Sequence, residues 1–145
     1  MPRSVLHFDP ALLRKARKEA GLRQEDAAEA AGMARTNSNA TETGRGHSPG
    51  PAGLVRLAGA VKVEPWELSG ITRDQATLRD LREWRGLNSN EVIERLDTWG
   101  TRRQLDRIEH GNAELSADQV PKLAALYDVD EATLRVAGEA TLRRS

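Results

Sequence analysis

The chain has 145 residues, with 22 basic and 22 acidic side chains, so its formal net charge at neutral pH is zero. Its contents of 38% hydrophobic and 30% charged residues are typical of a globular chain and exclude the disordered and collagen-like classes. The absence of Cys and the scatter of three His exclude disulfides and a metal site, and we expect no cofactor. No apolar run is long enough to span a membrane and no signal sequence opens the chain, so we expect a cytoplasmic protein without a membrane partner.

Three matched segments indicate that the sequence contains two copies of one unit. "ARKEAGL" at 16–22 reappears as "LREWRGL" at 81–87, and "ETGRG" at 42–46 is answered by "EHGNA" at 109–113. The third match pairs "LVRLAGAVKVEPWEL" with "VPKLAALYDVDEATL", and the three offsets are 65, 67 and 66 residues. Matched segments in the same order predict two similar units that divide near residues 69–72. We therefore expect one domain over residues 1–70 and a second over residues 71–145.

Apolar residues at helical spacing, bounded by Gly and Pro, predict five short helices in the first unit. Asp9 is a good N-cap, and Pro10 stands where the first residue of a helix tolerates proline. Gly21, Gly32 and Gly44 mark the ends of the first three helices. The predicted helices are 10–20, 24–31, 35–43, 54–61 and 65–68.

The second unit gives a similar series of helices. Thr72 and Gln75 have the spacing of a capping box, which predicts that its first helix begins there. The start of a later helix stays open between Ser116, which also has capping-box spacing, and Asp118, which keeps Pro121 within the first turn. The other predicted helices are 91–96, one capped by Thr101, and a last one that the C-terminal tail extends. Alternating β-branched runs are missing, so the predicted fold class is all-α.

The order of signals in each half resembles a known DNA-binding domain. Each half has a helix, "GL", a short helix, a turn, a helix ending in "E-x-G" and a helix with the pattern "L-x-x-L-A-x-x-x-x-V". This order resembles the helix-turn-helix domain of phage repressors and Cro, the xenobiotic-response-element type, over residues 10–68 and 75–134. The resemblance implies two tandem five-helix domains of this kind, the second with a C-terminal helical extension.

The resemblance also implies which residues contact DNA. In such domains the second helix of the motif lies in the major groove while the first crosses the backbone. Gln24, at the start of the first motif helix, would contact phosphate. Exposed side chains of the reading helices would contact bases, since Asn can bond adenine and Arg can bond guanine at two points. The candidates are Arg35, Thr36, Asn37 and Asn39 in the first unit and Thr101, Arg102, Arg103, Gln104 and Arg107 in the second.

The two units depart from this family's pattern in different places. Ser38 and Thr41 stand where the family carries apolar residues, so the first reading helix is degenerate. A regular helix and a remodelled segment both stay open there. The second unit keeps Leu105 and Ile108 in its reading helix, but its turn is two residues longer and has Trp99 in place of glycine.

Two ion pairs follow from the same resemblance. In such domains an Arg on the first helix pairs with the Glu that ends the reading helix. Arg17 with Glu42, and Arg82 with Glu109, stand at the matching positions of the two units. We expect both pairs to fix the geometry of the motif.

The sequence predicts a sequence-specific regulator of transcription that binds double-stranded DNA, is repressor-like, and uses two helix-turn-helix units in one chain. These units would act as a pseudo-dimer on two half-sites about one helical turn apart. Because the net charge is zero, DNA binding must come from the local placement of charge. The alternative is a protein–protein interaction module in which one or both units have lost DNA binding, and a homodimer also stays open. No grouping of nucleophile and base can be argued, so we expect no enzyme.

Overall fold

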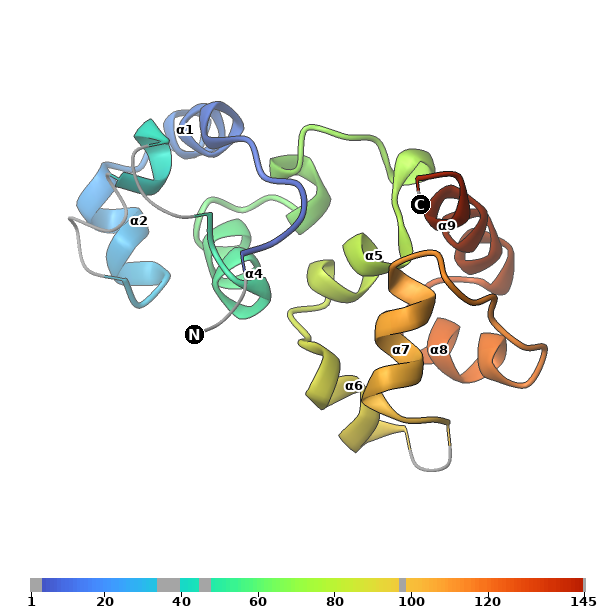
Figure 1. The fold of residues 1–145 in the computed structure, drawn as a ribbon. Helices are drawn as coiled ribbons and strands as arrows, with labels where there is room; N and C mark the ends of the chain where they lie inside the picture. Colours follow the sequence, from blue (N-terminus) through green and yellow to red (C-terminus); the bar gives the residue numbers. More distant parts are fainter. Residues whose placement is uncertain (1–3, 34–39, 45–47, 97–98, 145) are drawn as a thin grey trace. The chain divides into compact units, whose positions relative to one another are not determined.

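The computed structural model describes residues 4–33, 40–44, 48–96 and 99–144, and these residues form helices and turns without any strand (Figure 1). The predicted all-α class is therefore confirmed. By their internal contacts the residues divide into two compact units, 1–72 with 83–86 and 73–82 with 87–145. Within the described ranges, no helix is both long and apolar enough to cross a membrane.

The helices of the first unit bury a small core of leucines. α2 packs on α4, and η1, a single 3₁₀ turn, packs on α1 and α4. Leu13, Leu54, Leu57 and Leu68 are each at most 1% exposed. Residues 40–43 are helical as well. The bounds of the labelled elements are α1 (Pro10–Glu19), α2 (Gln24–Ala30), α4 (Pro51–Ala60) and η1 (Pro65–Leu68).

The ends of these helices follow the local signals in the sequence. Asp9 caps α1, because its Oδ1 accepts a hydrogen bond from the backbone nitrogen of Ala11 at 3.0 Å. Gly21 and Gly32, just beyond α1 and α2, have φ of +73° and +68°, a conformation that glycine adopts without strain. The predicted 35–43 helix falls mostly on residues outside the described ranges.

The second half of the chain forms a similar series with a longer last helix. α6 packs on α7, and α8 packs on α9. Val92, Leu105, Leu123 and Leu134 are each at most 1% exposed and form its core. α9 is one helix of 13 residues, which contains both the segment that corresponds to η1 of the first unit and the C-terminal tail. The last helix is therefore extended by the tail, as predicted. The elements are η2 (Arg73–Gln75), α5 (Leu78–Trp84), α6 (Ser89–Arg95), α7 (Arg102–Glu109), α8 (Gln119–Tyr127) and α9 (Glu131–Arg143).

The predicted start of the first helix in this half is wrong. The stretch between Thr72 and Gln75 forms the 3₁₀ turn η2, and α5 begins only at Leu78. The backbone nitrogen of Leu78 donates a buried hydrogen bond to Thr141 Oγ1, 3.0 Å away near the end of α9. A residue 63 positions later therefore satisfies one of the free N–H groups at the start of α5. No local capping pattern could have shown this contact.

The start of α8, which the sequence left open, lies next to Asp118. The helix begins at Gln119, and Pro121 is its third residue, inside the first turn where the missing N–H costs nothing. Gln119 Oε1 still accepts a hydrogen bond from the backbone nitrogen of Ser116 at 2.9 Å. The capping-box spacing of Ser116 and Gln119 therefore predicted a contact that forms, although the helix itself begins after Asp118.

Candidate nucleic-acid interface

Helix α7 is fixed at its start by a reciprocal cap. Thr101 Oγ1 accepts a hydrogen bond from the backbone nitrogen of Gln104 at 3.2 Å, and Gln104 Oε1 accepts one from the backbone nitrogen of Thr101 at 2.8 Å. Leu105 and Ile108 are 1% and 4% exposed and hold one face of the helix against the core. Because the cap uses the side-chain oxygens of Thr101 and Gln104, their hydrogen-bond donors are the groups that remain for a ligand.

The other end of α7 is held by a buried ion pair. Arg82 of α5 donates from Nε to Glu109 Oε2 at 2.7 Å and from Nη2 to Oε1 at 3.0 Å. Its Nη1 also donates to the backbone oxygen of Leu87 at 2.9 Å, in the turn after α5. The two side chains are only 8% and 5% exposed. The pair that the resemblance implied is confirmed, and one arginine joins α5, the following turn and the end of α7.

The first unit contains the same pair with fewer hydrogen bonds. Arg17 Nε donates to Glu42 Oε2 at 2.7 Å, and Arg17 Nη1 donates to the backbone oxygen of Leu22 at 2.8 Å. The side chains are 10% and 2% exposed, so this expected pair is confirmed as well. Glu42 Oε1, however, is buried and has no hydrogen-bond partner among the described residues.

Three exposed arginines lie on the surface of α7. Arg103 and Arg107 are four residues apart, so they lie on the same side of the helix, and within the described part of the chain neither has a hydrogen-bond or ion-pair partner. Glu109, the last residue of the helix, is neutralised by Arg82. The exposed side of α7 is therefore locally basic, although the whole chain is neutral.

Arg102 differs from the other two arginines because it already has partners. Its Nε lies 3.7 Å from Asp106 Oδ2, and its Nη1 donates to Asn90 Oδ1 of α6 at 3.2 Å. Asn90 was not among the predicted site residues. Its contact joins the two helices of the motif, and the 12 positions between the partners leave no local spacing signal for it.

The turn between α6 and α7 is anchored by Trp99. The indole is buried, with 5% of the residue exposed, and its Nε1 donates to the backbone oxygen of Gln119 at 3.1 Å. A tryptophan in this position is a structural residue rather than a base-stacking one. The longer turn of the second unit is thus tied to the start of α8.

The site residues predicted in the first unit are mostly outside the described ranges. Arg35, Thr36, Asn37 and Asn39 all fall in the stretch 34–39, so their roles stay predictions. Gln24 is described: it is the first residue of α2 and is half-buried.

The start of α2 is capped from one side only. Asp26 Oδ2 accepts a hydrogen bond from the backbone nitrogen of Arg23 at 3.1 Å and another from Arg23 Nε at 3.1 Å. These two hydrogen bonds lower the pKa of Asp26 below its usual value, and the one from the Arg23 side chain has the larger effect. Arg23 cannot return the bond, because a guanidinium has no acceptor.

The comparison with protein families agrees with this geometry. A family model described as a helix-turn-helix domain matches residues 11–69 and again residues 76–137. Neither the curated proteins nor the solved structures that were compared with the chain gave a match. The two matched segments contain both Arg–Glu pairs and the whole of α7. The chain belongs to the helix-turn-helix family and carries two such domains in tandem.

Proposed function

We propose that the protein is a repressor-like transcription regulator of the phage repressor and Cro type, which binds double-stranded DNA in a sequence-specific way. In this proposal α7 lies in the major groove as the reading helix, and α6 crosses the phosphate backbone. The function requires no cofactor and no catalytic step.

The basic, anchored face of α7 is the observation that carries this proposal. Arg103 and Arg107 project from a helix whose start is capped and whose end is held by a buried ion pair. A guanidinium can donate two hydrogen bonds to O6 and N7 of guanine. Because both side chains start from a fixed helix, little further ordering of the backbone opposes their binding.

Arg102 is suited to a different contact. Its guanidinium already meets Asp106 and Asn90, so fewer of its donors are free for a base edge. A phosphate oxygen beside the groove needs only one of them, and such contacts set the position of a protein on the duplex. We therefore assign Arg103 and Arg107 to bases and Arg102 to the phosphate backbone.

Selection of binding sites from random-sequence duplex DNA, with the full-length chain, tests this proposal. We expect an enriched sequence containing guanine, and mobility shifts that weaken as salt rises. A second half-site about one helical turn from the first would show that both units read DNA. Enrichment of no sequence would overturn the proposal and favour a module that binds a protein partner.

A variant pair makes the test specific for α7. Arg103→Ala removes an exposed arginine from the proposed reading face, whereas Arg56→Ala removes another exposed arginine, from α4 of the first unit. Both variants lower the net charge by the same amount, so a general electrostatic loss affects them equally. We expect loss of the selected sequence only with Arg103→Ala. Equal losses would show that the binding is non-specific.

A further inference from the structure

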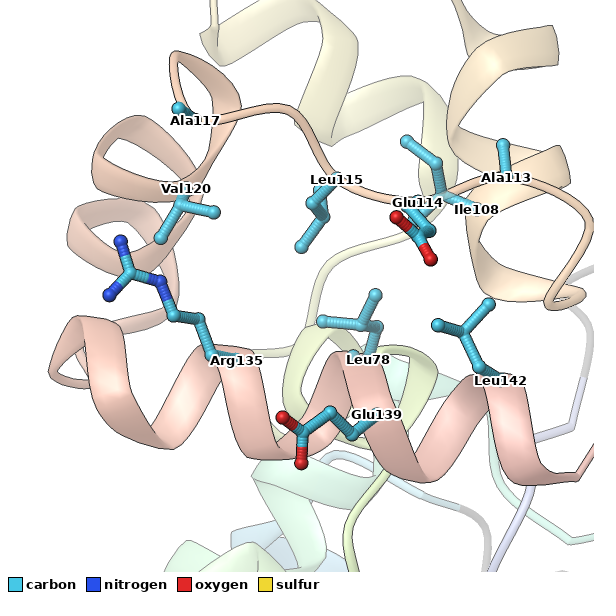
Figure 2. A pocket seen from close by; sticks show the side chains of 11 residues that line it. Leu78, Ile108, Ala113, Glu114, Leu115, Ala117, Val120, Arg135, Glu139 and Leu142 are labelled. Atoms are coloured by element: carbon cyan, nitrogen blue, oxygen red, sulfur yellow. The ribbon is translucent and has the colours of Figure 1, made fainter.

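A cavity of about 400 Å³ lies in the second unit, between α9 and the loop that joins α7 to α8 (Figure 2). This volume falls in the range of sites that bind small molecules. Leu142, on the α9 side, is 36% exposed, which is high for a large apolar side chain. The apolar residues that line the cavity include Leu78, Ile108, Leu115, Val120 and Leu142.

The space between α9 and the loop exists partly because residue 138 has no side chain. Gly138 lies in the interior of α9, where glycine is a poor helix former. A Cβ added there would lie 3.9 Å from Leu115 Cδ1, an ordinary van der Waals contact, so the backbone does not need glycine to avoid a clash. A larger side chain at this position would extend into the cavity.

The charged residues around the cavity favour a cation. Glu114 comes from the loop and Glu139 from α9, on opposite sides of the space (Figure 2). Within the described part of the chain, neither carboxylate has a hydrogen-bond or ion-pair partner. The basic residue of the lining, Arg135, has its Nη2 3.7 Å from Glu131 Oε1. An anion would meet two unpaired carboxylates, whereas a cation would be attracted by them.

We propose that this cavity is a binding site for a hydrophobic organic cation, an ammonium or phosphonium ion with a bulky apolar body. The body occupies the space beside Gly138 and contacts Leu115 and Leu142, and the charge lies near Glu114 and Glu139. The site is independent of the proposed DNA function, because it needs no residue from the exposed face of α7.

Calorimetric titration of the full-length chain, in the absence of DNA, tests the assignment. Tetraphenylphosphonium and tetraphenylborate have the same shape and opposite charge, so they separate the effect of charge from that of apolar area. We expect saturable binding of one phosphonium ion per chain and about tenfold weaker binding of the borate. Binding of the borate as tight as that of the phosphonium would overturn the assignment to cations.

Two matched leucine substitutions locate the site. Gly138→Leu fills the cavity, and Gly59→Leu adds the same side chain to α4 of the first unit, where a Cβ meets nothing within 4 Å. We expect Gly138→Leu to weaken phosphonium binding about tenfold or more and Gly59→Leu to leave it unchanged. Equal effects of the two would contradict the location.

Charge variants examine the two carboxylates. We expect Glu114→Gln combined with Glu139→Gln to weaken phosphonium binding about two- to fivefold, since exposed charges interact weakly, and to reduce the preference over the borate. Glu29→Gln combined with Glu94→Gln changes the net charge equally at exposed positions elsewhere and should have no effect. Equal losses in both double variants would leave the carboxylates without a specific role and refute their part in the site.

Methyl NMR of the unsubstituted chain keeps the test decisive even if Gly138→Leu does not fold. Added phosphonium should shift the methyl signals of Leu115, Val120 and Leu142, which line the cavity. It should leave those of Leu54 and Leu57, in the core of the first unit, unchanged. Shifts confined to methyl groups outside the cavity would refute the proposal.

Discussion

The two units share an ion pair, but its hydrogen bonding is complete only in the second. Arg82 donates to both carboxylate oxygens of Glu109, whereas Arg17 reaches Glu42 only at Oε2. The other oxygen of Glu42 is buried without a partner among the described residues, and such a group costs about 1–3 kcal/mol. A repeated fold can therefore keep the same contact at the same place while the contact stabilises its two copies unequally.

The first helix of the motif shows the same difference. In α6 the cap is reciprocal: Asn88 Oδ1 accepts from the backbone nitrogen of Glu91 at 2.9 Å, and Glu91 Oε1 accepts from that of Asn88 at 3.1 Å. In α2 only Asp26 contributes, because Arg23 has no acceptor. Both contrasts indicate that, among the described residues, the helix-turn-helix of the second unit is held more completely, and its helix α7 presents a basic exposed face.

The largest expected effect comes from breaking the complete ion pair. Arg82→Ala leaves Glu109 buried and unpaired, and we expect the free energy of unfolding in urea to fall by about 3–5 kcal/mol. Arg17→Ala should cost less, because fewer hydrogen bonds are lost. Arg14→Ala and Arg95→Ala, at exposed positions, serve as controls. Losses of the same small size in all four variants would show that neither pair matters for stability.

The next effect concerns the division of DNA binding between the units. A two-point contact between arginine and guanine is worth about 1–3 kcal/mol, so Arg103→Ala or Arg107→Ala should weaken specific binding by about tenfold or more. Arg102→Ala should mainly lower the salt dependence, as loss of a phosphate contact does. Mobility shifts on the selected duplex measure both. If Asn37→Ala were the most damaging change, the first unit would be the main reader.

Exchange of the caps should reverse part of the difference between α2 and α6. Arg23→Asn supplies the missing acceptor, so we expect the melting temperature to rise by a few degrees. Asn88→Arg removes the acceptor from α6 and should lower the melting temperature, both measured by circular dichroism. An unchanged melting temperature in both variants would show that the two caps are equivalent.

The smallest effect is a loss of stability in acid. Hydrogen bonds from Arg23 lower the pKa of Asp26, and hydrogen bonds from Thr133 lower that of Asp130, the N-cap of α9. Each depressed pKa contributes stability that is present above the usual Asp value of about 3.9 and is lost as the pH falls through the lowered value. As the pH falls through these pKa values, the melting temperature of Asp26→Asn and that of Asp130→Asn should fall less steeply than the melting temperature of the unsubstituted chain. Curves parallel to that of the unsubstituted chain would contradict this linkage.

Local sequence signals determined most helix ends and the repeat itself. Asp9 and Thr101 cap helices at the predicted places, and Gly21 and Gly32 end two others. Each of these contacts joins residues at most a few positions apart, so the pattern of residue types is sufficient to show it. The exposed arginines of α7 could be placed on one helix for the same reason.

Tertiary contacts decided the features that no local pattern contains. The start of α5 combines a local contact, in which Asp80 Oδ2 accepts from the backbone nitrogen of Thr77 at 2.9 Å, with a distant one, in which Thr141 Oγ1 of α9 accepts from the backbone nitrogen of Leu78 at 3.0 Å. Only the distant contact lies beyond any local pattern. Likewise, Arg102 meets Asn90 only because α6 and α7 lie side by side. Partners so far apart in the chain come together only after the helices have packed. The sequence could therefore point to the exposed arginines of α7, but it could not show that Arg102 among them contacts Asn90.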